Sequence, residues 1–235
     1  MYAKLRWIVP ALSLLAWYPV QVTAADTTPG TRKILVLPAY VKVYSLTASG
    51  SVEDSPDATA AASGYGNVEL QRYLATDAAF KLVPMPTLSA SEQSTLDEHV
   101  ALYKSIVHDA HMADSLGGPW KAPLAAFTYS VGPGLDFVRQ RSGADYLLVL
   151  VAEDGESTAG RIAMTMLFGG LVGRNYISAG LIDLHTGNVV WLNYDTHNAK
   201  DFVVQANMTQ FVDDILQDYP EGSLHDAASA DPASH

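Results

Sequence analysis

The 235-residue sequence contains no cysteine and few basic residues. Without cysteine, the chain has no disulfide bond, no thiolate metal site and no side chain to carry a covalent lipid anchor. Lys and Arg together number 14 against 25 Asp and Glu, which gives a formal net charge of −11. Because phosphate groups are bound by clustered Lys and Arg, this balance argues against a nucleic acid partner. It also disfavours electrostatic adhesion to anionic lipid headgroups.

The sequence also has little that suits a membrane span. The apolar stretch from Trp7 to Tyr18 is interrupted by proline, and it is shorter than the ~20 residues that a spanning helix needs. It follows two basic residues and precedes Val22-Thr23-Ala24, an arrangement typical of an export signal. We predict a signal peptide over residues 1–24 and a periplasmic or secreted protein, with a retained membrane anchor as the alternative. Cleavage leaves 14 − 2 = 12 basic residues against 25 acidic ones, a net charge of −13.

Motifs for nucleotide binding and serine hydrolysis are incomplete or missing. Gly155 to Ile162 nearly has the spacing of a phosphate-binding loop, but Arg161 and Ile162 stand where that loop needs Lys and then Ser or Thr. The Gly-x-Ser-x-Gly sequence of serine hydrolases does not occur. We therefore predict no cofactor, no metal ion and no catalytic residue.

The histidines offer an alternative that points to catalysis. His108 and His111 lie three residues apart on a predicted helix, close to several acidic residues. One helix supplies at most two histidine ligands there, whereas a catalytic zinc ion usually has three protein ligands. Solvated helix histidines are the preferred interpretation.

The centre of the chain predicts a buried strand followed by a hairpin. Leu147 to Val151 is an unbroken apolar run, which is typical of a strand covered on both faces. Two runs rich in β-branched and aromatic residues then flank His185-Thr186-Gly187-Asn188. Because glycine tolerates the positive φ of a short turn, we predict a late β-hairpin over residues 176–194. Gly187 should be left-handed there, and Trp191 largely buried.

The remaining segments predict alternating strands and helices. Lys33 to Tyr44 is a strand that Pro38 interrupts, and the aperiodic stretch 47–64 is a loop. The other expected elements are a strand over 81–85 and helices over 67–79, 89–110, 135–141 and 204–219, the last one capped at Asn198 and Asp201.

This order predicts an α/β fold, a mixed sheet of about five strands with helices packed on it. No repeat is visible and the pattern supplies one core. We expect a single α/β domain over residues 25–220 and a disordered tail over 221–235.

Three short motifs carry a resemblance to a known family: Ile34-Leu-Val-Leu-Pro38, Gly143-Ala-Asp-Tyr-Leu-Leu-Val149 and Gly180-Leu-Ile-Asp-Leu-His-Thr-Gly-Asn-Val-Val-Trp191. They resemble the core of bacterial envelope accessory proteins of the type of the curli-secretion lipoprotein CsgG, the penicillin-binding-protein activator LpoB and the exopolysaccharide protein PelC. The resemblance implies an anticodon-binding-domain-like fold and a non-enzymatic role in the periplasm. Those relatives are typically lipoproteins, whereas this chain has no cysteine to acylate, so we expect no covalent lipid anchor.

The segment from Ile162 to Gly173 is apolar and rich in Met and Gly. One interpretation is an ordinary core element that covers the sheet. The other is an adaptable binding surface, for which Met and exposed apolar residues are suited. The predicted partner interface consists of Ile162, Met164, Met166, Leu167, Phe168, Leu171 and Val172.

Together these features predict an exported, non-enzymatic scaffold or adaptor protein. We expect it to act in cell-envelope assembly, secretion or polysaccharide and cell-wall regulation through protein–protein contacts. The expected partners are envelope proteins, including a second copy of the chain in a homo-oligomer. The alternative is an envelope hydrolase or metal-dependent enzyme that uses the region of His108 and His111.

Overall fold

A computed structural model of the chain describes residues 32–76, 80–115, 129–168, 175–197, 201–217 and Tyr219. The predicted signal peptide and the predicted C-terminal tail lie outside these residues. The strands are β1 (Arg32–Val36), β2 (Tyr40–Leu46), β3 (Val52–Asp54), β4 (Phe80–Val83), β5 (Tyr146–Ser157), β6 (Asn175–Asp183) and β7 (Val189–His197). The helices are α1 (Pro56–Ala75), α2 (Ala90–Ser115), α3 (Asp136–Ser142), α4 (Ala159–Phe168) and α5 (Gln205–Leu216). In the described part of the chain, no helix combines the length and the apolar character needed to cross a membrane.

All strands belong to one mixed sheet with β5 at its centre. Along one edge, β5 pairs in parallel with β1 and then with β2, and along the other edge it pairs antiparallel with β6. Beyond these, β4 pairs with β1, β3 pairs with β2, and β7 pairs with β6. Because β1 and β2 share one edge of β5, the strands occupy five positions across the sheet. The predicted mixed sheet of about five strands is thus confirmed.

The break between β1 and β2 lies at Pro38, as predicted. Proline has no N–H for the ladder, and the residues on either side find other partners. The backbone N–H of Leu37 donates to the carbonyl oxygen of Leu148 at 3.0 Å. The N–H of Ala39 donates to Oδ1 of Asn67 in α1 at 2.7 Å. The two halves therefore continue along the same edge of β5 without an unsatisfied donor at either of these positions.

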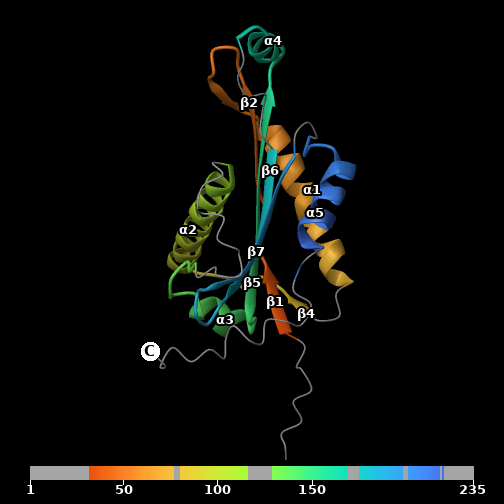
Figure 1. Cartoon of the computed structure of the whole chain (residues 1–235). Coiled ribbons are helices and arrows are strands. Elements are labelled where there is room, and N and C mark those ends of the chain that lie inside the picture. The colour runs from red at the N-terminus through yellow and green to blue at the C-terminus, as the bar shows by residue number, and fades with distance from the viewer. Residues whose placement is uncertain are drawn as a thin grey trace, which may run out of the picture. The chain divides into compact units, whose positions relative to one another are not determined.

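Helices cover both faces of the sheet, with α1 and α5 on one side and α2 and α3 on the other (Figure 1). Because successive strand residues point to opposite faces, β5 contributes to two separate cores. Leu148 and Leu150 pack with α1 and α5, whereas Leu147 and Val149 pack with α2 and α3. This arrangement confirms the prediction of a strand buried on both faces.

The prediction of a loop over residues 47–64 is wrong, since this range contains β3 and the first turns of α1. Helix α1 starts with Pro56 at its N-terminus and Asp57 in its first turn, both of which favour a helix start. Residues 56–64 are mainly small and show no apolar period, which concealed the helix. A Cβ on Gly66, further along α1, would lie 3.0 Å from the Cβ of Ala39, so glycine allows α1 to approach the segment between β1 and β2 closely.

The late hairpin forms as predicted from β6 and β7. Oδ1 of Asp183 accepts hydrogen bonds from the backbone N–H groups of His185 and Thr186, at 2.7 and 3.0 Å. Gly187 has φ of +75°, which confirms its left-handed conformation. Trp191 is only partly buried, contrary to expectation, because it packs at the margin of the core against Tyr219, edge to face at 5.1 Å.

We predict that Gly187→Ala destabilises the protein more than Gly50→Ala. Both glycines have positive φ, which costs a residue with a Cβ about 1 kcal/mol. A Cβ at Gly187 would also lie 2.0 Å from the carbonyl oxygen of Gly132, whereas one at Gly50 meets nothing within 4 Å. We expect a loss of roughly 2–4 kcal/mol for Gly187→Ala. Equal shifts of the urea midpoint for the two variants would contradict the packing described for this turn.

Candidate functional site

Helix α4 follows β5 directly, and Thr158 fixes the junction. The Thr158 hydroxyl donates a hydrogen bond to the carbonyl oxygen of Leu46 at the end of β2, at 3.1 Å. The hydroxyl oxygen of Thr158 also accepts a hydrogen bond from the backbone N–H of Arg161 at 3.3 Å, in the manner of an N-cap. Gly160 allows a close approach to the turn after β2, since a Cβ there would lie 3.2 Å from that of Ala48. The start of α4 is therefore attached to the β2 edge of the sheet.

The rest of α4 stands clear of the core, at the far end of β5 beside the β2–β3 turn (Figure 1). Met166, Leu167 and Phe168 are 81%, 74% and 76% exposed. Successive helix residues point about 100° apart, so three consecutive exposed side chains mean that much of the helix circumference is uncovered. None of the residues of α4, all of which the structure describes, is buried.

The predicted interface residues therefore differ in what the structure shows of them. Ile162 is half-buried beside the helix start, and Met164 is exposed like the three residues at the helix end. Leu171 and Val172 lie outside the described residues. The apolar residues Met164, Met166, Leu167 and Phe168 of α4 are therefore not part of the core. We define the four exposed residues Met164, Met166, Leu167 and Phe168 as the α4 surface.

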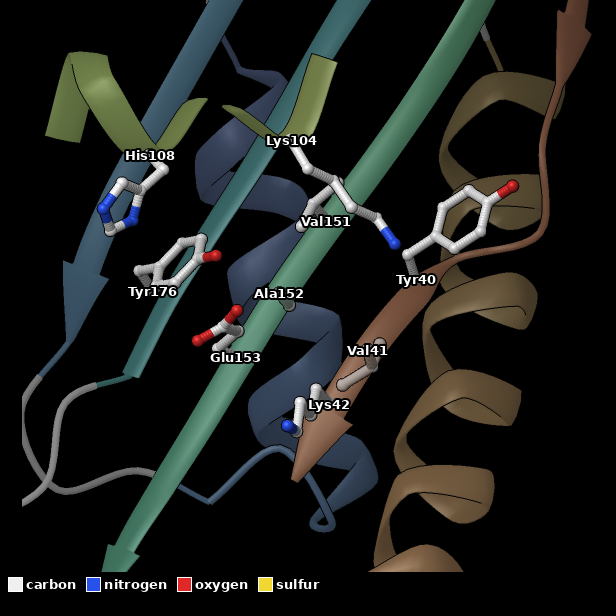
Figure 2. Close-up of a pocket in the computed structure, with 9 residues that line it drawn as sticks. All are labelled: Tyr40, Val41, Lys42, Lys104, His108, Val151, Ala152, Glu153 and Tyr176. Carbon is white, nitrogen blue, oxygen red and sulfur yellow. The ribbon is translucent and has the colours of Figure 1, made fainter. Parts of the chain in front are cut away.

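His108, the first residue of the alternative catalytic proposal, lines a cavity of about 240 Å³ on the α2 side of the sheet (Figure 2). Lys104 extends across this cavity, with Nζ 4.2 Å from the centre of the Tyr40 ring. Glu153 and Tyr176 line the wall on β5 and β6. The side chain of His111 lies outside what the structure describes, so the predicted histidine pair is not tested.

The ionisable groups that line this cavity influence one another's pKa. Burial lowers the pKa of Lys104, partly offset by the charges of Glu153 and Asp97. Burial and the neighbouring Glu153 raise the pKa of Tyr176. The Tyr176 hydroxyl therefore stays protonated at neutral pH and is a poor nucleophile. These contacts support packing of α2 on the sheet.

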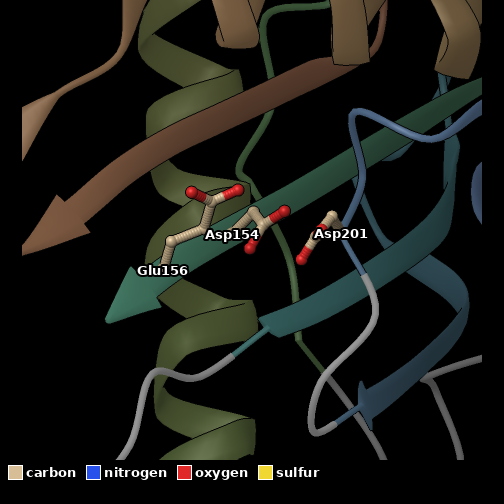
Figure 3. A group of neighbouring side chains, drawn as sticks. All are labelled: Asp154, Glu156 and Asp201. Carbon is tan, nitrogen blue, oxygen red and sulfur yellow. The ribbon is translucent and has the colours of Figure 1, made fainter. Parts of the chain in front are cut away.

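A second group of polar residues lies on the opposite face of β5. Asp154, Glu156 and Asp201 place one carboxylate oxygen each within 4.8 Å of one another (Figure 3). Asp154 and Glu156 are two positions apart on one strand, which puts both on the same face. Asp201 comes from the segment before α5, where Phe202 is buried against Phe211. We call these three residues the acidic group. It contains no histidine.

The environment of Asp154 is unusual for a carboxylate. Its side chain is fully buried, and Oδ2 accepts a hydrogen bond from the backbone N–H of Phe202 at 2.8 Å. Burial raises the pKa of Asp154 from 3.8 to about 6, the hydrogen bond from Phe202 lowers it in part, and the charges of Glu156 and Asp201 raise it again. Asp154 is thus a carboxyl whose ionised form the fold disfavours.

Sequence reasoning did not find the acidic group. It interpreted Asp201 as a helix cap, but α5 begins at Gln205 with Val204 in the cap position. The available signal was the alternation of Asp154 and Glu156 directly after the buried part of β5. Acidic residues two positions apart on a strand place two negative charges on the same face. No basic residue next to them in the sequence balances these charges.

Comparisons with known proteins give similar solved structures but no match by sequence. No protein-family model matches the sequence, and no characterised protein matches it by sequence. Among solved structures, the chain is similar to the C-terminal domain of LpoB from Salmonella enterica, with 16% identity, a TM-score of 0.29, and 74% of this chain and 88% of that chain covered. It is also similar to the lipoprotein GNA1162 from Neisseria meningitidis, with 14% identity, a TM-score of 0.35, and 80% and 96% covered.

We predict that Asp154→Asn stabilises the protein more at pH 8 than at pH 5. A carboxyl whose pKa is higher in the folded state contributes stability below its unfolded pKa and loses that contribution as pH rises through the folded value. For Asp154 the loss falls between about pH 4 and pH 6. The neutral amide of Asn does not ionise and so avoids this loss of stability. Its oxygen can still accept the hydrogen bond from the backbone N–H of Phe202. We expect a gain on the order of 1–3 kcal/mol at pH 8 in buffer with EDTA.

Urea unfolding of the variant and the parent protein at both pH values measures this difference. Glu53→Gln is the matched control, because Glu53 is an exposed carboxylate of β3 outside the acidic group. Its difference from the parent should be small at both pH values. If Asp154→Asn unfolds at lower urea than the parent protein at pH 8, the ionised carboxylate is needed and our account of its environment is wrong.

Proposed function

We propose that the protein is an exported accessory protein of the bacterial cell envelope that acts by binding another protein through the α4 surface, without catalysis. The observation that carries this proposal is an apolar helix, held at its first turn, whose residues Met164, Met166, Leu167 and Phe168 are exposed. Its partners are envelope proteins, with a second copy of the chain as the simplest case. The proposal includes no nucleic acid, no cofactor and no covalent lipid anchor.

Energetics support a binding role for the α4 surface. A fully buried Leu, Phe or Met side chain contributes about 1.5–3 kcal/mol relative to an exposed one. The α4 surface obtains little of this within the chain, because its end residues are about three-quarters or more exposed. Met and aromatic residues are enriched in the centres of protein interfaces, and charged residues are depleted there. Arg161, at the start of the helix, is the one charged residue of α4.

A protein partner fits this surface better than a lipid bilayer. A helix that lies in a membrane interface usually combines its apolar face with Lys and Arg on the polar face. After the first turn, α4 carries no basic residue, and the mature chain is strongly acidic. A helix of this length is also too short to cross a bilayer, which needs about 20 residues. We therefore infer that the α4 surface is buried against another protein.

The attachment of α4 suits this role. Thr158 ties the first turn of the helix to Leu46 of β2, and β5 connects it to the centre of the sheet. The surface is therefore presented in a defined orientation, so less conformational freedom is lost on binding than with a flexible segment. An attached first turn and an exposed C-terminal end of α4 are what a preformed binding helix requires.

Export rests on the N-terminal sequence. We predict that N-terminal sequencing of the protein from bacterial cells finds residue Ala25 first, because Val22-Thr23-Ala24 has the small residues that signal peptidase requires. The protein should be recovered from the periplasm or the medium. An intact Met1 on protein recovered from the membrane fraction would contradict cleavage and would favour an anchored form.

The α4 surface is tested by replacing Leu167 with Ser and Phe168 with Asp. We expect the double variant to lose mass in light scattering if the partner is a second copy, and to lose its captured partner in a pull-down if it is another envelope protein. Removing two buried apolar side chains should weaken binding on the order of 10²-fold. The urea midpoint should change little, because both side chains are exposed in the free protein.

A control pair of equal chemistry is Val68→Ser with Leu102→Asp, since both residues are exposed on helices that cover the sheet. This pair should keep the mass and the partner. If the α4 variant assembles and binds as the parent protein does, the α4 surface is not the interface. If the α4 variant unfolds, the segment belongs to the core after all, and the proposal fails as well.

A further inference from the structure

Within the described ranges, no basic side chain forms an ion pair with the acidic group. None of the ion pairs formed between described residues includes Asp154, Glu156 or Asp201. Three carboxylates therefore face one another within 4.8 Å. Like charges at such separations repel, and more strongly where burial lowers the local dielectric constant. Solvent screens the charges of Glu156 and Asp201, which are exposed, whereas the buried Asp154 is stabilised by protonation or by a bound cation.

A buried oxygen in this group points to a cation independently of the charge count. The Asp154 side chain is 0% exposed, and its Oδ1 makes no hydrogen bond of normal geometry, although the side chain of Asn175 is a neighbouring donor on β6. The other oxygen, Oδ2, is the one that accepts from Phe202. A buried polar atom without a partner is rare in folded proteins and calls for an explanation such as an ion. Figure 3 shows the Asp154 carboxylate beside those of Glu156 and Asp201.

We propose that Asp154, Glu156 and Asp201 bind one divalent cation, and that its chemistry is that of Ca²⁺. Three carboxylates are hard oxygen ligands, which suit Ca²⁺ or Mg²⁺ and not the thiophilic metals. Calcium–oxygen distances of about 2.3–2.6 Å allow two ligand atoms on opposite sides of one ion to be about 5 Å apart. The corresponding limit for Mg²⁺ is about 4.2 Å. The oxygens of this group lie at most 4.8 Å from one another, which is compatible with shared ligation of one cation. Ca²⁺ accepts irregular oxygen geometry, whereas Mg²⁺ demands a near-ideal octahedron.

The elements that hold the three residues keep them in place. Asp154 lies in the ladder between β2 and β6, opposite Val43 and Asn175. Glu156 is two residues further along β5 and still pairs with β2. Asp201 is positioned by its neighbour Phe202, which is fully buried. A cation here joins the end of β5 to the segment that leads into α5. This role is independent of the binding function proposed for α4.

The test is a calcium titration of the full-length protein after removal of metal ions with EDTA and dialysis at pH 7.5. Isothermal titration calorimetry should show one site with a Kd of about 10⁻⁴–10⁻³ M, the range of weak, extracellular calcium modules. At 10 mM CaCl₂ the melting temperature should rise by about 3–7 °C through ligand linkage. No binding and no rise at this concentration would overturn the proposal.

Two variants distinguish specific calcium binding at the acidic group from nonspecific screening of the protein's negative charge by calcium. Asp201→Asn removes a ligand that is exposed, so the fold should persist, and calcium affinity should fall at least tenfold. Glu153→Gln is the matched control, because it removes a neighbouring charge that points into the cavity on the opposite face of β5. It should keep the parent affinity. Equal responses of both variants to calcium would overturn the proposal.

Two further measurements test the choice of ion and the role of Asp154 as a ligand. MgCl₂ at the same concentration should raise the melting temperature less than CaCl₂, and an equal rise would overturn the assignment to calcium. Asp154→Asn should fold in EDTA and show no rise with CaCl₂. A full calcium response of this variant would show that the buried oxygen is not a ligand, and the proposal would fail.

Discussion

The structure depends on β5 being buried on both faces and paired on both edges. From Leu147 to Ala152 every residue is buried, which ties two separate helix layers to one strand. Such a strand tolerates no polar residue without a partner, and its first half contains none. Everything that resembles a functional site in this protein lies where that constraint ends, at the carboxyl-terminal half of the same strand.

The alternation of side chains in β5 distributes the polar groups after Ala152. Glu153 points to the α2 side, where it meets Tyr176 and the cavity lined by Lys104. Asp154 points to the opposite side, where it meets Glu156 and Asp201. One face thus receives compensating charges and the other receives charges of a single sign. This difference accounts for the mutual contacts of the charged groups on the α2 side and for the proposal of a cation on the other side.

Much of the fold is predictable from the sequence because its signals are local. The apolar run at Leu147–Val151, the proline at Pro38 and the turn glycine Gly187 each encode their structure within a few residues. The start of α1 escaped prediction because residues 56–64 are mainly small and show no apolar period. The acidic group escaped prediction for another reason, since Asp201 meets Asp154 only after the chain has formed β6 and β7. Long-range contacts of single residues leave no periodic trace.

The exposure of α4 shows a second limit of sequence reasoning. An apolar helix looks the same in sequence whether it is covered by its own sheet or by another protein. Only the structure shows that the far end of β5 carries it beyond the helices that cover the sheet (Figure 1). The two candidate sites share this end of β5, yet different contacts hold them. Thr158 attaches α4 to β2 through Leu46, whereas the acidic group attaches β5 to the entry of α5 through Asp201 and Phe202. Loss of the acidic group should therefore loosen the entry of α5 and leave the α4 surface in place, because none of the contacts that hold the first turn of α4 involves those carboxylates.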